Sequence, residues 1–173
     1  GAAARVMALV AIPLMIVNSV IPPIIVQFYS QNELVKLERI LRSTASISLP
    51  FALVMVVIFF FWGSTILTFV FGSLYQNGAL ILLILSFGQV ANVGAGSCGM
   101  VLMLTGYQKT MKIITIIFGV LTVLFSLLVV QRYGIVGVAT SAFLGMMLQN
   151  MFMVFYVKLK TGMWTHAYLS PFR

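Results

Sequence analysis

Charged side chains are scarce in this chain, and acidic ones are nearly missing. Only 7% of the 173 residues are charged, whereas 62% are hydrophobic. A soluble domain carries about 25% charged residues, so this composition excludes an ordinary soluble fold and favours the lipid bilayer as the solvent.

The only two acids, Glu33 and Glu38, stand in one short segment between apolar runs. The apolar runs therefore lack the carboxylate that ion- and proton-coupled transporters usually place inside the membrane. With so few acids and one histidine, the chain cannot assemble a metal cluster, a paired-carboxylate site or a catalytic triad, so we expect no enzyme and no cofactor. Cys98 is the single cysteine, which excludes an internal disulfide.

Long apolar runs make up most of what is present. No charge occurs from Ser43 to Gln108; as one helix this stretch would be about 100 Å long, against a bilayer core of about 30 Å, so it must fold back. Segments such as ALVMVVIFFFW lack the alternation of barrel strands. We predict an all-α integral membrane protein, with residues 1–173 as a single membrane domain and five transmembrane helices at about 6–29, 44–71, 79–104, 112–131 and 135–157.

The segment between the first two expected spans is amphipathic. Leu34, Leu37 and Leu41 share one helical face, and the charged residues cover the other. We predict a short helix at about 32–42 that lies on the cytoplasmic interface as an ordered connector; a role in binding lipid headgroups is the alternative.

The net charge is +8, and the basic residues that produce it are concentrated in particular loops. Consecutive loops face opposite sides of a membrane, and one side collects every basic residue except Arg5 and Arg132. By the positive-inside rule that side is cytoplasmic, which places the N-terminus outside and the tail at 158–173 inside the cell. The charge thus reports orientation in the cytoplasmic membrane, and no nucleic-acid partner is expected.

The stretch GAGSCG, residues 94–99, matches the glycine pattern of a dinucleotide-binding loop. That loop needs a preceding strand and an acid about 20 residues later, and neither is expected here. Small residues in a membrane helix let neighbouring helices approach closely and allow bending. We therefore interpret Gly94, Gly96 and Gly99 as packing or hinge positions.

Amide side chains interrupt three of the apolar runs, and polar groups within a membrane usually face the bundle interior or a water-filled cavity. In the first run they flank Pro22 and Pro23, which remove backbone donors and bend a helix. Two readings stay open: the amides line a transport path beside a moving bend, or they bond to neighbouring helices beside a static kink. The predicted cavity residues are Asn18, Gln27, Gln89, Asn92, Gln149 and Asn150.

Three stretches of sequence resemble one family of membrane proteins. They are AIPLMIVNSVIPPIIVQFY with ELVKLERILRSTA, MVLMLTGYQKTMKI, and YGIVGVATSAFLGMMLQNMF with KLKTGM. In this order they resemble the C-terminal half of polysaccharide-biosynthesis flippases of the O-antigen and teichoic-acid type, in the superfamily that includes the MATE multidrug antiporters and the lipid II flippases. The resemblance implies five helices of the C-terminal six-helix lobe of a transporter with twelve or fourteen spans.

The resemblance also implies a function. Such flippases move isoprenoid-diphosphate-linked oligosaccharide across the cytoplasmic membrane by alternating access, so the implied partners are this substrate, membrane lipids and the N-terminal lobe of the same protein. The chain begins GAAAR without an initiator methionine, and we expect a fragment that lacks that lobe and the helix before residue 1. The expected spans hold no Lys or Arg for the diphosphate apart from Arg5 near an outer end, so the cations would come from the missing lobe.

Other functions stay open at this point. An ion-coupled multidrug or metabolite antiporter of the same superfamily would need an intramembrane acid in the missing half. A membrane enzyme of glycan assembly would need a polar loop, and the expected outer loops FGSLYQNG and QRYG are short and lack acids. A structural membrane subunit is the fourth reading. The sequence leaves the glycan, the coupling ion and the oligomeric state undetermined.

Overall fold

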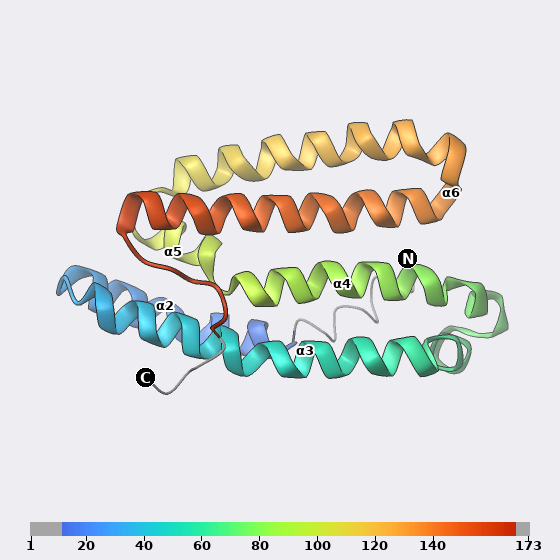
Figure 1. Cartoon of the computed structure of the whole chain (residues 1–173), viewed down its shortest axis with the longest axis horizontal. Helices are drawn as coiled ribbons and strands as arrows, with labels where there is room; N and C mark the ends of the chain where they lie inside the picture. The colour runs from blue at the N-terminus through green and yellow to red at the C-terminus, as the bar shows by residue number, and fades with distance from the viewer. Residues whose placement is uncertain (1–11, 169–173) are drawn as a thin grey trace.

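The computed structural model describes residues 12–168, except for the side chains of residues 12–14 and 16–18. Within this range every regular element is a helix, as the sequence predicts (Figure 1). In chain order they are α2 (Ile12–Ser30), α3 (Leu34–Phe71), the 3-10 helix η2 (Ser73–Gly78), α4 (Ala79–Ala95), α5 (Cys98–Leu104) and α6 (Gln108–Thr161).

Three stretches of the described chain are long and apolar enough to cross a membrane, namely Leu34–Phe71, Ser73–Ala95 and Gln108–Thr161. Large apolar side chains also cover much of their outer surface, such as Phe60 and Phe61 on α3 and Leu128 on α6. These helices indicate a membrane protein. The count of five spans stays a prediction.

Helix α3 corrects one expectation, because the helix expected at 32–42 is not separate from the span that follows. The buried residues Leu37, Leu41, Ala45, Ser48 and Ala52 recur at intervals of three and four. These buried residues form one continuous stripe along α3, and the helix runs through both expected segments without a break. At about 1.5 Å per residue α3 is about 57 Å long, so its charged first turns extend beyond a hydrocarbon core of about 30 Å.

A second correction concerns the span expected at 79–104. The helix is broken: α4 ends at Ala95 and α5 begins at Cys98. The break falls within GAGSCG, where a segment from later in the chain contacts it, as described below.

Helix α6 folds back on itself at Gly134, whose φ of 58° and ψ of −144° are not helical. Its two arms, residues 108–133 and 135–161, lie side by side (Figure 1). A Cβ atom built on Gly145 would collide with Thr122 of the opposite arm, so glycine allows the arms to approach closely.

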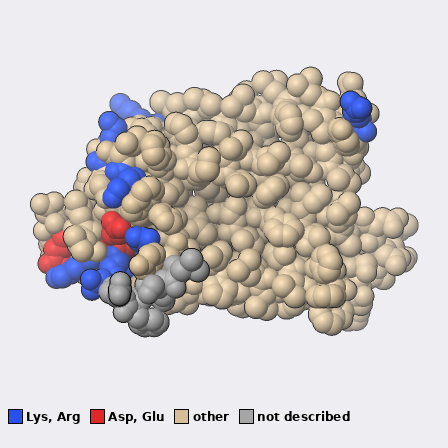
Figure 2. Space-filling model, viewed as in Figure 1, with Lys and Arg blue, Asp and Glu red and all other residues tan. Residues whose placement is uncertain are grey.

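Helix α4 packs against both α3 and α6, and α2 packs against α3 and α5. The larger buried cluster includes Ile25, Leu37, Leu102, Val157 and Met163, from four helices and the segment after α6. Basic and acidic side chains gather at one end of the molecule, and a small basic group marks the other (Figure 2). The charged end is where α3 and α6 begin and α6 ends, and Arg132 lies beside the fold-back of α6.

Candidate functional site

Three of the predicted amides form a chain of hydrogen bonds between helices. Asn150 on the second arm of α6 donates to Asn92 Oδ1 on α4 at 3.3 Å, and Asn92 donates to Gln89 Oε1 at 3.3 Å. The Cys98 thiol at the start of α5 donates weakly to Asn150 Oδ1 at 3.9 Å. This series of hydrogen bonds therefore joins α4, α5 and α6 through side chains alone.

The local sequence places these amide side chains at the contact between α4 and α6. Gln89 and Asn92 are three residues apart and share one face of α4. Gly88 lies next to Gln89 and packs near α6, where a Cβ would meet the Phe143 Cα at an ordinary distance of 3.5 Å. Gln89 and Asn150 are buried, and buried amides in an apolar bundle need such partners because an unpaired one is costly.

A pocket of about 280 Å³ opens beside these hydrogen-bonded amides. Its polar lining comes from Asn92, Ser97, Gln149 and Asn150, and its apolar lining is rich in flexible methionine side chains. The methionines are Met100, Met103, Met111 and Met153. The lining carries donors and acceptors without charge, which suits hydroxyl- and amide-bearing ligands better than anions or cations.

The pocket also adjoins the break between α4 and α5. Gly96 has a φ of 69°, a left-handed value that favours glycine. A Cβ there would collide with the Thr165 carbonyl and lie 3.2 Å from the Ala45 Cβ. At Gly94 and Gly99 a Cβ would meet neighbours at ordinary distances of 3.6 Å. Gly96 is therefore the one of the three predicted hinge glycines that this geometry requires.

The remaining predicted residues lie elsewhere. The Asn18 side chain and Arg5 lie outside the described part of the chain. Gln27 is exposed on α2 and does not line the pocket. Helix α2 continues through Pro22 and Pro23, the first half-buried and the second exposed.

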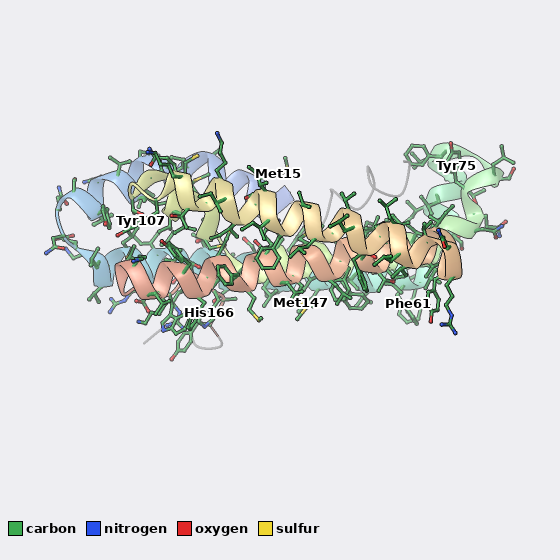
Figure 3. All side chains as sticks on the ribbon, turned by 90° about the horizontal axis from the view of Figure 1, so that it is seen from above. Met15, Phe61, Tyr75, Tyr107, Met147 and His166 are labelled. Atoms are coloured by element: carbon green, nitrogen blue, oxygen red, sulfur yellow. The ribbon has the colours of Figure 1, made fainter. Side chains whose placement is uncertain are left out.

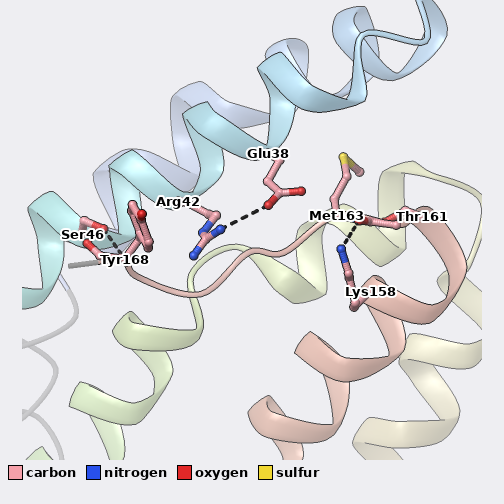
Figure 4. A network of polar contacts seen from close by, with 8 residues as sticks. Glu38, Arg42, Ser46, Lys158, Thr161, Met163 and Tyr168 are labelled. Carbon is pink, nitrogen blue, oxygen red and sulfur yellow. Dashed lines mark hydrogen bonds and ion pairs between the residues drawn. The ribbon is translucent and has the colours of Figure 1, made fainter. Parts of the chain in front are cut away.

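Sequence reasoning missed a segment that we term the C-terminal strap, residues 162–168. It leaves α6 at Gly162, runs back across the break and reaches α3 (Figure 4). Met163 and Thr165 are fully buried while Trp164 and His166 are half-buried. This alternation of burial is typical of an extended segment packed on one side, but the sequence of these four residues does not alternate between apolar and polar types, so no local signal indicated it.

The strap lines a second, open pocket of about 400 Å³, which Asn150 lines as well. Met147 and Phe155 of α6 and Trp164 and His166 of the strap are part of its lining. Figure 3 shows His166 nearer the end with Tyr107, Met147 near the middle of the molecule and Tyr75 at the far end. Asn150 thus contributes to both pockets, and the strap forms a wall of the second.

Charged groups of α3 act on the strap. Burial, followed by the nearby Arg42 guanidinium, lowers the pKa of His166 from its ordinary 6.5, and Glu38 partly opposes this. The Arg42 guanidinium lies 4.4 Å from the centre of the Tyr168 ring and also pairs with Glu38 at 3.3 Å. On the α6 side, Lys158 lies 5.2 Å from the centre of the Trp164 ring.

Comparison with known proteins gives one distant relation. The chain is 25% identical over 123 residues to the capsular polysaccharide biosynthesis protein CapF of Staphylococcus aureus. The match covers 71% of this chain but 31% of that protein, so the chain spans less than a third of the relative's length. No family model and no solved structure matches the chain. The expected relation to polysaccharide biosynthesis is supported in this coarse form.

Proposed function

We propose that this chain is part of a flippase that moves isoprenoid-diphosphate-linked oligosaccharide across the cytoplasmic membrane for surface polysaccharide biosynthesis. The observation that carries the proposal is the uncharged amide chain Gln89–Asn92–Asn150 beside a methionine-rich pocket in an apolar bundle. The distant relation to a capsular polysaccharide biosynthesis protein supports the substrate class.

The pocket chemistry fits the sugar part of such a substrate. Glycans present many hydroxyl groups, which pair with amide donors and acceptors. The methionine walls can adapt to different sugar rings, because the side chain is flexible and polarisable. The diphosphate needs cations, and this pocket supplies none, so we assign that role to the other lobe of the full protein.

The proposed mechanism is alternating access between two lobes. In the proposed orientation the charged end of Figure 2 faces the cytoplasm, as the positive-inside rule requires. The pocket would then meet the substrate from the inner leaflet and release it after the lobes rock. Amides suit this cycle because they hold sugars without the strong binding that would slow release.

A double substitution tests the amide chain. In the full-length protein, Gln89→Leu with Asn92→Leu should reduce surface polysaccharide about tenfold, the effect of losing about 1.4 kcal/mol of interaction with the substrate. Protein quantity in the membrane should stay unchanged. The matched control is Gln76→Leu, because Gln76 lies on η2 away from the amide chain. Unchanged polysaccharide in the double variant would exclude these residues from the substrate path.

A further inference from the structure

The break between α4 and α5 depends on the strap for a hydrogen bond. In an uninterrupted helix the Gly94 carbonyl would accept from the N–H of Cys98, four residues on. In the structure this carbonyl accepts from the N–H of Ala167 at 2.8 Å. A helix broken among apolar neighbours must have such a partner, since an unpaired carbonyl there is costly.

The strap also packs closely against the left-handed Gly96 at the break. The Thr165 carbonyl stands where a Cβ of residue 96 would lie, and the Thr165 side chain is fully buried. Strap docking and a continuous α4–α5 helix are alternatives at this point, because the Gly94 carbonyl bonds to the Ala167 N–H when the strap is docked and would bond to the Cys98 N–H in a continuous helix, which a left-handed Gly96 does not allow.

The strap is held mainly from the charged end of the molecule. Ser46 on α3 makes two hydrogen bonds with Tyr168, accepting from its N–H at 2.7 Å and donating to its carbonyl at 2.8 Å (Figure 4). Arg42 stacks on the Tyr168 ring. Arg42 and Ser46 lie in the first third of α3, at or close to its charged first turns.

Docking also carries a cost. The Thr165 hydroxyl and the Arg42 Nε atom are buried without a hydrogen-bond partner in the described part of the chain. Each would regain partners in water if the strap left, and this opposes the favourable contacts. The two opposing contributions bring the docked and undocked states closer in energy.

We propose that the strap and the α4–α5 break form one two-state switch. With the strap docked, the helix is broken at Gly96 and Cys98 contacts Asn150 in the pocket. With the strap released, residues 79–104 form one helix, which turns Cys98 and Gly99 relative to α4 and changes the pocket wall. Events at the charged end thereby control the shape of a pocket within the bundle. This inference does not rest on the proposed transport function.

The alkylation rate of Cys98 tests the switch directly. Cys98 is 2% exposed in the docked state. The full-length protein in membrane vesicles is treated with N-ethylmaleimide, and modification of the Cys98 peptide is followed by mass spectrometry. Gly96→Ala disfavours docking, so we expect alkylation about tenfold faster than in the unchanged protein. The control Gly94→Ala adds the same methyl group and the same helix propensity where a Cβ meets only Leu49, at 3.6 Å.

A milder pair of variants covers the case in which Gly96→Ala does not fold. Ser46→Ala removes both bonds to Tyr168 and should also speed alkylation severalfold. Its control is Thr44→Ala, because the Thr44 hydroxyl bonds only within α3, to the Ile40 and Leu41 carbonyls. Alkylation at the unchanged rate in Ser46→Ala overturns the proposal. Equal acceleration by Gly94→Ala and Gly96→Ala also overturns it, because helix propensity alone would then explain the effect.

Discussion

At the scale of single residues, the amides of the pocket follow from a simple physical rule. An amide inside an apolar run is costly unless it finds a partner, so its presence points to the bundle interior. Gln89, Asn92 and Asn150 meet this expectation by bonding to one another. The same rule does not distinguish residues near a helix end, and Gln27 is exposed.

The strap histidine gives a prediction about pH. His166 binds a proton less readily in the docked strap than in water, because burial and Arg42 lower its pKa while Glu38 only partly opposes them. Its favourable contribution to docking is therefore complete above its ordinary pKa of 6.5 and is lost as pH falls through the lowered value. Acidification should release the strap.

Fluorine NMR of the full-length protein labelled with 5-fluorotryptophan measures this release at Trp164, whose ring lies 4.9 Å from that of His166. A Trp164→Phe variant identifies the resonance. The signal should move toward that of a solvent-exposed ring below pH 6.5, and His166→Gln should remove the change. A shift that persists in His166→Gln would contradict the assignment of the pH effect to His166.

At the scale of helices, the local sequence pattern predicts those features that depend on residues close together in the chain. The apolar runs predicted helices, but the sequence analysis separated the helix at 32–42 from the following span, and the buried stripe from Leu37 to Ala52 accounts for their continuity in α3. The break in α4–α5 was not predictable in the same way. Its small residues permit bending, but the strap that replaces the helical hydrogen bond at Gly94 lies about 70 residues later in the chain. Nonlocal contacts of this kind leave little trace in local composition.

The close approach of the two arms of α6 gives a prediction at this scale. Gly145→Val places a side chain against Thr122, so the arms must separate. We expect a loss of about 1–3 kcal/mol in the free energy of unfolding, the usual cost of overpacking. The measurement is thermal or denaturant unfolding of the full-length protein in detergent.

Gly119→Val is the matched control for that experiment. Gly119 lies in the middle of the first arm, and a Cβ there would meet no atom within 4 Å. The two variants carry the same change in helix propensity and differ in the contact. Equal destabilisation by both would show that the arms do not meet as described.

At the scale of the whole molecule, charge and hydrophobicity are segregated. Most charged groups gather at one end, a small basic group stands at the other, and the face between them carries no charge in this view (Figure 2). Many large apolar side chains are exposed on the described helices. This arrangement is what a bilayer selects, and the positions of the charges along the sequence predicted it. The proposed transport further requires that these helices pack against a second lobe, which is part of the proposal.

Orientation provides a direct prediction. In the full-length protein with Cys98→Ser, a cysteine in place of Lys109 should react with a membrane-impermeant maleimide only after the cells are opened. A cysteine in place of Arg132 should react in intact cells, because this residue lies at the opposite end. The reverse pattern would invert the proposed orientation.

The most direct test of the central claim follows the lipid-linked intermediates in cells that lack the full-length gene. The account predicts that completed oligosaccharide-diphosphate lipid accumulates and stays on the cytoplasmic leaflet, where externally added glycan-binding probes cannot reach it. Restoring the gene should return it to the outer leaflet. Normal export of the glycan, with no accumulation of the lipid-linked intermediate, would contradict the flippase function.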